Sequence, residues 1–110
     1  MHVDELQTPA LLVDRGAFDR NVATMSSALP GDRLRPHVKA FKSTALARRL
    51  ADAGHRAFCA ATPREIIGMA HDNGYRVCTY TPNDPVRVAE LGGWGVDTII
   101  TDAVDQIPPV

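Results

Sequence analysis

The residues best suited to chemistry in this chain lie in one stretch, residues 35–42, which reads Arg-Pro-His-Val-Lys-Ala-Phe-Lys. Because this stretch is short and contains apolar residues, it predicts a buried strand over residues 34–40, with Lys39 near the end of the strand. A lysine at the mouth of an α/β barrel can form a Schiff base, because desolvation lowers the pKa of the amine and leaves it nucleophilic. Lys39 is therefore the first candidate catalytic residue.

The sequence pattern for a metal site is much weaker than the pattern around Lys39. Cys59 and Cys78 could join His37 in a zinc site, but the sequence has no Cys-x-x-Cys pair and no His-x-x-x-His pair. Buried thiols are the simpler interpretation of both cysteines. The dipeptide His71-Asp72 looks like a catalytic pair in isolation, yet its place before Asn-Gly predicts the end of a helix. We predict no metal site.

Composition limits the class of protein. The chain has 110 residues, whereas a complete (β/α)8 barrel needs roughly 250. The net charge of −1 gives no electrostatic basis for binding nucleic acid. Neither an apolar leader nor a membrane-spanning run is present in the sequence, so we expect no membrane partner and a cytoplasmic location.

The order of predicted elements indicates the fold class. Short apolar runs alternate with segments of helical periodicity, which is typical of βαβ units in a mostly parallel sheet. Ser43 and Asp84 are expected to begin helices, and Thr62 with Glu65 forms a capping box. Strands are expected at residues 9–14, 34–40, 57–61, 76–80 and 96–101. The predicted class is α/β, and we treat residues 1–110 as a single domain.

Several motifs in residues 6–69 occur in the order found in a known family. They are Thr-Pro-Ala-Leu-Leu-Val-Asp at residues 8–14, Asn21, Leu-Arg-Pro-His-Val-Lys at residues 34–39, Lys42, and Ala61-Thr62 with Glu65. This segment resembles the N-terminal part of the D-threonine aldolase and D-serine dehydratase family, an alanine racemase-like barrel that binds pyridoxal phosphate (PLP). Phe41 stands where that family usually has histidine. The resemblance implies that Lys39 binds PLP as a Schiff base and that His37 and Arg35 shape the adjoining pocket.

The remaining residues, 70–109, carry motifs of a second family. They are His-Asp-Asn-Gly-Tyr-Arg-Val at residues 71–77, Tyr80-Thr81, Asn83-Asp84-Pro85, Trp94-Gly95-Val96-Asp97 and Ile99-Ile100-Thr101-Asp102. This part is similar to the C-terminal end of glycerophosphodiester phosphodiesterases, in which an apolar residue usually stands at Pro82. The resemblance implies that Tyr80 lines a substrate pocket, and that the family's catalytic histidines and metal carboxylates lie on earlier strands.

Both families are barrels, so we interpret the chain as a chimera of two TIM-barrel fragments, engineered or recombined. The boundary of ancestry falls within residues 63–74, where helices of the two families overlay. Two architectures remain open: a half-barrel, or an open flavodoxin-like sheet. We expect a homodimer, because two half-barrels can close an eight-stranded barrel and cover the exposed face of the sheet.

Three functional hypotheses follow. The leading one is a folded chimeric protein without native catalytic activity and without a cofactor, because each parental set of catalytic residues is incomplete. The alternative is a PLP-binding fragment that acts on D-amino acids through Lys39. A third is a phosphate-ester-binding fragment that uses Tyr80 and donors from nearby loops.

Overall fold

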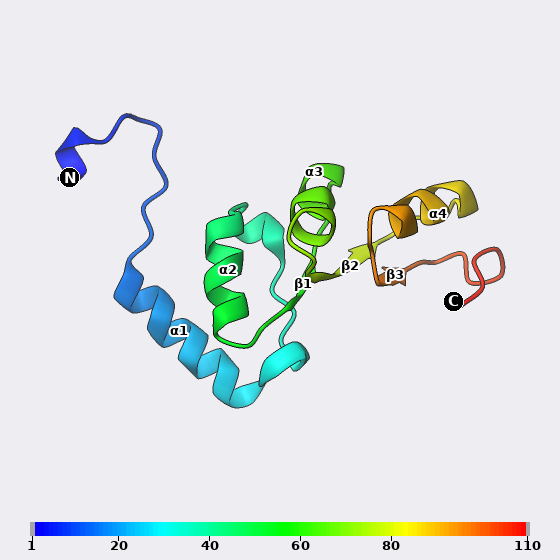
Figure 1. The fold of residues 1–110 in the computed structure, drawn as a ribbon, viewed down its shortest axis with the longest axis horizontal. Helices are drawn as coiled ribbons and strands as arrows, with labels where there is room; N and C mark the ends of the chain where they lie inside the picture. Colours follow the sequence, from blue (N-terminus) through cyan, green and yellow to red (C-terminus); the bar gives the residue numbers. More distant parts are fainter. Residues whose placement is uncertain (1, 110) are drawn as a thin grey trace.

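A computed structural model describes residues 2–109 of the chain (Figure 1). Helices and strands alternate from residue 57 onward, which confirms the predicted α/β class. The elements are η1 (Val3–Glu5), α1 (Arg15–Ala28), η2 (Gly31–Arg33), η3 (Val38–Ala40), α2 (Thr44–Asp52), β1 (Ala57–Cys59), α3 (Pro63–Ile66), η4 (Ile67–His71), β2 (Arg76–Tyr80), α4 (Pro85–Gly93) and β3 (Thr98–Ile100).

The sheet is small, open and parallel, with the strand order β1-β2-β3. Cys59 lies opposite Cys78, and Cys78 in turn lies opposite Thr98. A single parallel bridge between His37 and Cys59 adds a fourth chain segment beside β1. This arrangement is an α/β half-barrel, and it brings the carboxyl ends of all these segments to one edge of the sheet.

The two faces of the sheet have different surroundings. Phe58 and Val77 are fully buried on one face, and in Figure 1 α3 and α4 lie on one side of the strands. Side chains alternate along a strand, so the opposite face carries Tyr80 and Ile100, which are 39% and 52% exposed. The half-barrel therefore covers one face of its sheet with helices and leaves much of the other open.

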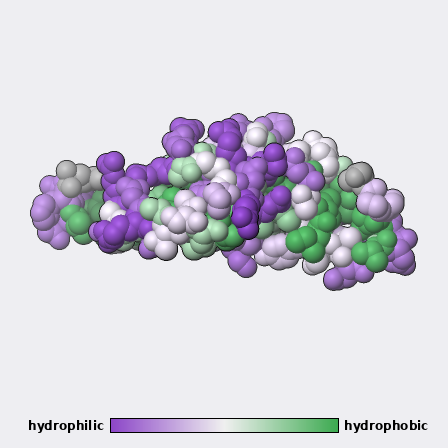
Figure 2. Space-filling model, turned by 90° about the horizontal axis from the view of Figure 1, so that it is seen from below, coloured by the Kyte–Doolittle hydropathy of each residue, from purple (hydrophilic) through white to green (hydrophobic). Residues whose placement is uncertain are grey.

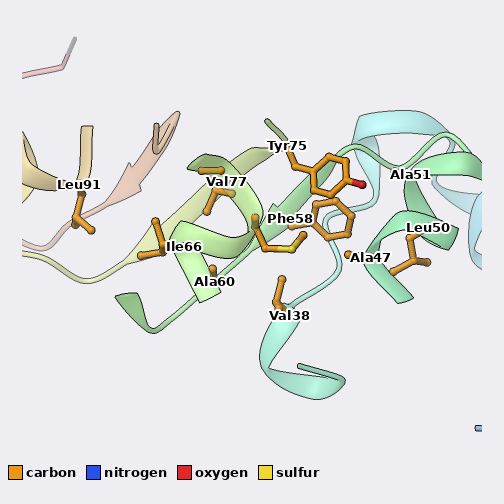
Figure 3. Close-up of a cluster of buried hydrophobic side chains, with 12 residues drawn as sticks. Val38, Ala47, Leu50, Ala51, Phe58, Ala60, Ile66, Tyr75, Val77 and Leu91 are labelled. Carbon is orange, nitrogen blue, oxygen red and sulfur yellow. The ribbon is translucent and has the colours of Figure 1, made fainter. Parts of the chain in front are cut away.

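The hydrophobic core fills the space between the sheet and the helices (Figure 3). The Phe58 and Tyr75 rings pack at a tilt, with centroids 5.2 Å apart. Met69 is almost fully buried and belongs to the same cluster, and Leu91 is the residue of α4 that is buried in this core. Helices α2 and α4 and the segment α3–η4 contribute buried apolar residues that recur at helical spacing, whereas α1 has no buried residue and only packs partly buried side chains against the core.

A buried histidine ties α1 to the body of the fold. The His55 ring is fully buried, and its Nδ1 lies 2.8 Å from the carbonyl oxygen of Gly31. Because that oxygen can only accept, Nδ1 carries the proton and donates. Nε2 lies 2.6 Å from the Ser26 hydroxyl on α1. His55 therefore satisfies two polar groups that would otherwise lie unpaired at this junction.

Two of the predicted strands are wrong. Residues 9–14 form an extended, exposed segment that pairs with no strand among residues 2–109, because no sheet edge lies beside it. The predicted strand over residues 34–40 contracts to the bridge at His37, and Val38–Ala40 forms a turn of 3-10 helix instead. Pro36 has no N–H to donate to a sheet and only accepts a hydrogen bond, from the Cys59 N–H.

The molecule is elongated, and apolar side chains reach its surface. Its radius of gyration is 16.2 Å, whereas a compact chain of this length has about 13 Å. Figure 2, seen from below, shows hydrophobic surface at the end of the molecule that carries β3 and the C-terminal segment. Ile100 and Val104 are among the exposed residues there, and Leu11 is 77% exposed in the N-terminal segment. None of the described helices is both long and apolar enough to cross a membrane.

Candidate functional site

The carboxyl edge of the sheet brings together three of the four predicted site residues. His37 Nε2 lies 2.7 Å from the Tyr80 hydroxyl, and the two rings meet edge to face with centroids 5.6 Å apart. His37 Nδ1 accepts a hydrogen bond from the backbone N–H of Lys39, at 3.2 Å. Because Nδ1 accepts, the ring proton of the neutral histidine lies on Nε2 and is donated to Tyr80.

The electrostatics of this edge keep His37 neutral. Burial lowers the pKa of His37, and the positive charges of Lys39 and Lys42 lower it further, while Glu65 acts in the opposite direction. A neutral ring is the form that the two hydrogen bonds require. The cluster of His37, Lys39 and Tyr80 therefore presents one positive charge next to an aromatic hydroxyl and a neutral imidazole.

Lys39 lies on the turn η3 and is exposed, rather than at the end of a buried strand. The prediction of a desolvated strand-end lysine is wrong, because the chain leaves the sheet at Val38 and turns outward. Arg35 is also exposed, and its side chain reaches Cys78, which lies away from Lys39 toward the middle of β2. The structure thus brings His37, Lys39 and Tyr80 to one edge and leaves Arg35 apart from them.

A second charged pair lies on the helical side of the same loop. Lys42 Nζ lies 2.7 Å from Glu65 Oε1, and Glu65 is 8% exposed. Glu65 Oε2 also accepts from the backbone N–H groups of Ala61, at 3.0 Å, and Thr62, at 3.3 Å. Thr62 Oγ1 accepts from the Glu65 N–H, so the predicted capping box is confirmed.

The Glu65 carboxylate is stabilised in its charged form. Burial alone would raise the pKa of Glu65, but the hydrogen bonds from Lys42, Ala61 and Thr62 outweigh burial and lower it. Lys42 itself adopts φ = 45°, a left-handed conformation that directs the chain into α2. This pair therefore fixes the loop that follows the candidate cluster and has a structural role.

A cavity among the described residues does not coincide with the candidate cluster. It has a volume of about 950 Å³ and lies between the start of α2 and the helical segment α3–η4. Lys42, Glu65 and Met69 line it, whereas His37, Lys39 and Tyr80 do not. The candidate cluster is an exposed edge rather than an enclosed pocket.

The other candidates have structural environments. His71 Nδ1 lies 2.9 Å from Asp72 Oδ1 at the exposed end of η4, which is the helix end expected from the sequence. Cys59 and Cys78 are free thiols. Within residues 2–109, no group of three or more His, Cys, Asp or Glu side chains is arranged to hold a metal ion.

A test of the His37 environment is the pH dependence of stability. Because the folded protein disfavours protonated His37, the unfolded chain takes up the proton first as the pH falls through about 6.5. Stability is therefore complete above that pH and decreases below it. We expect His37→Gln to lose less stability than the native chain between pH 7.5 and pH 5.5 in urea titrations. Equal pH dependence of His37→Gln and the native chain would contradict this assignment.

Two features of the site were missed in the sequence. One is the contact between Lys42 and Glu65, which are 23 residues apart. The other is the pairing of Cys59 with Cys78, for which a signal exists, because each cysteine is the third residue of its strand. Asn83 Oδ1 also accepts from Thr101 Oγ1, at 2.8 Å, and thereby joins the loop after β2 to the end of β3.

Comparison with known proteins gives one match. The model of the glycerophosphoryl diester phosphodiesterase family matches residues 10–106. No curated protein and no solved structure matches the chain. The match covers residues 70–106 of the segment in which this family was expected, residues 70–109, and it also extends to residue 10 on the N-terminal side. The aldolase-like resemblance of residues 6–69 stays a prediction. The chain therefore belongs to the glycerophosphoryl diester phosphodiesterase family.

Proposed function

We propose that this chain is a folded half-barrel domain, chimeric in ancestry, that does not catalyse a reaction by itself. The observation that carries the proposal is the engagement of three acid–base groups, His37, His55 and Glu65, in structural contacts. Both ring nitrogens of His37 are hydrogen bonded, Glu65 caps α3, and His55 is buried between Ser26 and Gly31. A general base needs a free site near the proton that it abstracts.

The direct test is an assay of the purified chain with substrates of both parental families. Glycerophosphodiester hydrolysis is measured with added Ca²⁺ or Mg²⁺, and aldol cleavage and dehydration of D-amino acids with added PLP. We expect no turnover above the rate in buffer. Turnover that is lost in His37→Gln or Lys39→Ala would refute the proposal, because it would assign the reaction to this edge.

We further propose that two copies associate and cover the open face of the sheet. The support is the exposure of Ile100 on that face, together with the exposure of Val104 in the C-terminal segment and of Leu11 and Leu12 in the N-terminal segment. Exposed apolar surface of this kind is unfavourable in water. In a symmetric dimer, each copy buries this surface against the same surface of the other copy. Light scattering should give about twice the chain mass of 11.9 kDa. Ile100→Lys should return the mass to that of one chain, whereas a native monomer would refute the association.

A second candidate function is the binding of PLP by Lys39. The observation that favours it is the exposed position of Lys39, whose side chain makes no hydrogen bond or ion pair within residues 2–109. The neighbouring His37 and Tyr80 offer a polar ring pair, and PLP carries an aldehyde for the amine and a phosphate for positive charge. In this reading Lys39 supplies the amine and Tyr80 contacts the ligand.

Absorbance spectroscopy separates the two candidates. If PLP binds through Lys39, the native chain develops a Schiff-base absorbance band on titration, and borohydride reduction attaches PLP to Lys39 in peptide mass spectra. Lys39→Ala should lack the band, and Lys42→Ala is the matched control that keeps it. The chain has only two lysines, Lys39 and Lys42. Equal labelling of Lys39 and Lys42, or no band, would remove this candidate and leave the non-catalytic domain.

A further inference from the structure

The open face of the sheet carries a pair of thiols that neither candidate function uses. Cys59 on β1 and Cys78 on β2 are direct partners in the parallel register. Directly opposed residues of neighbouring strands point to the same face, and their strands lie about 4.8 Å apart. Disulfides form between residues whose Cα atoms are about 4.4–6.8 Å apart. The register therefore places the two side chains next to each other on one face, at a backbone spacing that falls within the Cα range of disulfides.

The two thiols have unequal environments. Cys78 is 4% exposed, whereas Cys59 is only partly buried. Burial raises the pKa of Cys78, the neighbouring Cys59 side chain acts in the same direction, and the Arg35 guanidinium acts against both. Cys78 is thus held as a thiol beside a more accessible sulfur.

The surroundings of the pair are polar. His37 pairs with Cys59 across the bridge, and its ring is hydrogen bonded to Tyr80, which lies two residues beyond Cys78. Arg35 reaches Cys78 from the other end of the same chain segment. Polar groups beside a partly accessible thiol are typical of reactive cysteines, whereas cysteines enclosed by apolar side chains are inert.

We propose that Cys59 and Cys78 form an oxidation site that a hydroperoxide converts to a disulfide between β1 and β2. The Cys59 sulfur attacks one peroxide oxygen and the O–O bond breaks. The leaving oxygen takes a proton, so hydrogen peroxide yields one water and Cys59 sulfenic acid. The Cys78 sulfur then attacks the Cys59 sulfur, and the S–O bond breaks. The hydroxide leaves with the Cys78 proton as a second water, so one peroxide is reduced and two thiols are oxidised.

The test is treatment of the folded chain with hydrogen peroxide, followed by alkylation and mass spectrometry. We expect the native chain to lose both alkylatable thiols, to become lighter by two hydrogen atoms, and to yield a peptide pair joined through Cys59 and Cys78. A thiol reductant should restore both thiols. The same treatment in concentrated urea should form the disulfide more slowly, because the sheet no longer holds the sulfurs together.

Two single variants test the separate roles. Cys78→Ser should accumulate a sulfenic acid at Cys59, trapped by a dimedone-type reagent, whereas Cys59→Ser should keep Cys78 alkylatable after unfolding. Circular dichroism checks that both variants are folded. Persistence of both thiols in the folded native chain, a disulfide that joins two chains instead, or sulfenic acid at Cys78 would each overturn the proposal.

Discussion

Phe58→Ala is expected to lower the free energy of unfolding by about 3–5 kcal/mol, the usual range for truncating a buried phenylalanine. The Phe58 ring is fully buried on β1 and packs against Tyr75. Its removal forfeits the transfer free energy of the ring and leaves a cavity beneath the helices. Small domains have only about 5–15 kcal/mol of stability, so this single change removes a large part of it. Urea unfolding followed by circular dichroism measures the effect.

The matched control for Phe58→Ala is Val86→Ala. Val86 lies on α4 with 76% of its surface exposed, so its truncation should change the free energy of unfolding by less than about 0.5 kcal/mol. Phe58→Leu keeps an apolar side chain of smaller volume and should fall between the two. Equal effects of Phe58→Ala and Val86→Ala would show that β1 does not lie at the centre of the core.

Glu65→Ala is expected to lower the free energy of unfolding by about 2–4 kcal/mol, from the loss of a helix cap and of charge-assisted hydrogen bonds. The substitution leaves the N–H groups of Ala61 and Thr62 without their carboxylate acceptor. The Lys42 partner contributes little of this, because its side chain is 65% exposed and the ion pair is screened by water. Urea unfolding at pH 7 measures the loss.

Two variants separate the contributions to the Glu65 effect. Lys42→Met removes only the exposed partner and should cost less than about 1 kcal/mol. Glu65→Gln keeps a carbonyl acceptor and removes the charge. Because the pKa of Glu65 is lowered in the folded protein, its stabilisation is complete above the unfolded pKa of about 4.3 and is lost as the pH falls below it. The difference between Glu65→Gln and the native chain should therefore shrink below pH 4, and a constant difference would contradict the assignment.

The helices could be predicted from the sequence because their signals are local. Ser43, Thr62 and Asp84 each accept a backbone hydrogen bond at the start of the helix that they were expected to begin. A cap and the apolar stripe that follows it lie within a few residues of each other. The helix that spans the predicted boundary of ancestry also forms, as α3 followed by the π-helical turn η4.

The strands were predictable only where a partner exists. The pattern at residues 9–14 is as apolar as that of β2, yet only β2 has neighbours on both sides. A strand is stabilised by hydrogen bonds to residues far away in the sequence, which its own composition does not specify. The same reason explains why the strand predicted over residues 34–40 is longer than the observed pairing. The bridge at His37 depends on Cys59, and the turn η3 begins directly after it.

The sequence predicts which residues form the candidate cluster, but it does not predict how these residues are arranged or hydrogen bonded. Lys39, His37 and Tyr80 were each identified from motifs, but the hydrogen bond between His37 and Tyr80 joins residues 43 positions apart. Its formation depends on the order β1-β2 and on the bridge beside β1. The exposure of Lys39 follows from a local turn that no motif indicated.

The parallel direction of all the strands limits how the sheet can grow. Within residues 2–109 its two edges differ: one is the segment at His37 and the other is β3. Such an edge can pair only with the unlike edge of another copy if the strands are to stay parallel. A rotation of 180° between copies uses both pairs of edges at once and ends growth at two chains. A smaller rotation that divides the full turn evenly closes a larger ring, whereas a rotation that does not close leaves one edge free at each end, and addition of chains then continues as a fibre. The curvature of this sheet therefore decides between a closed ring and a polymer.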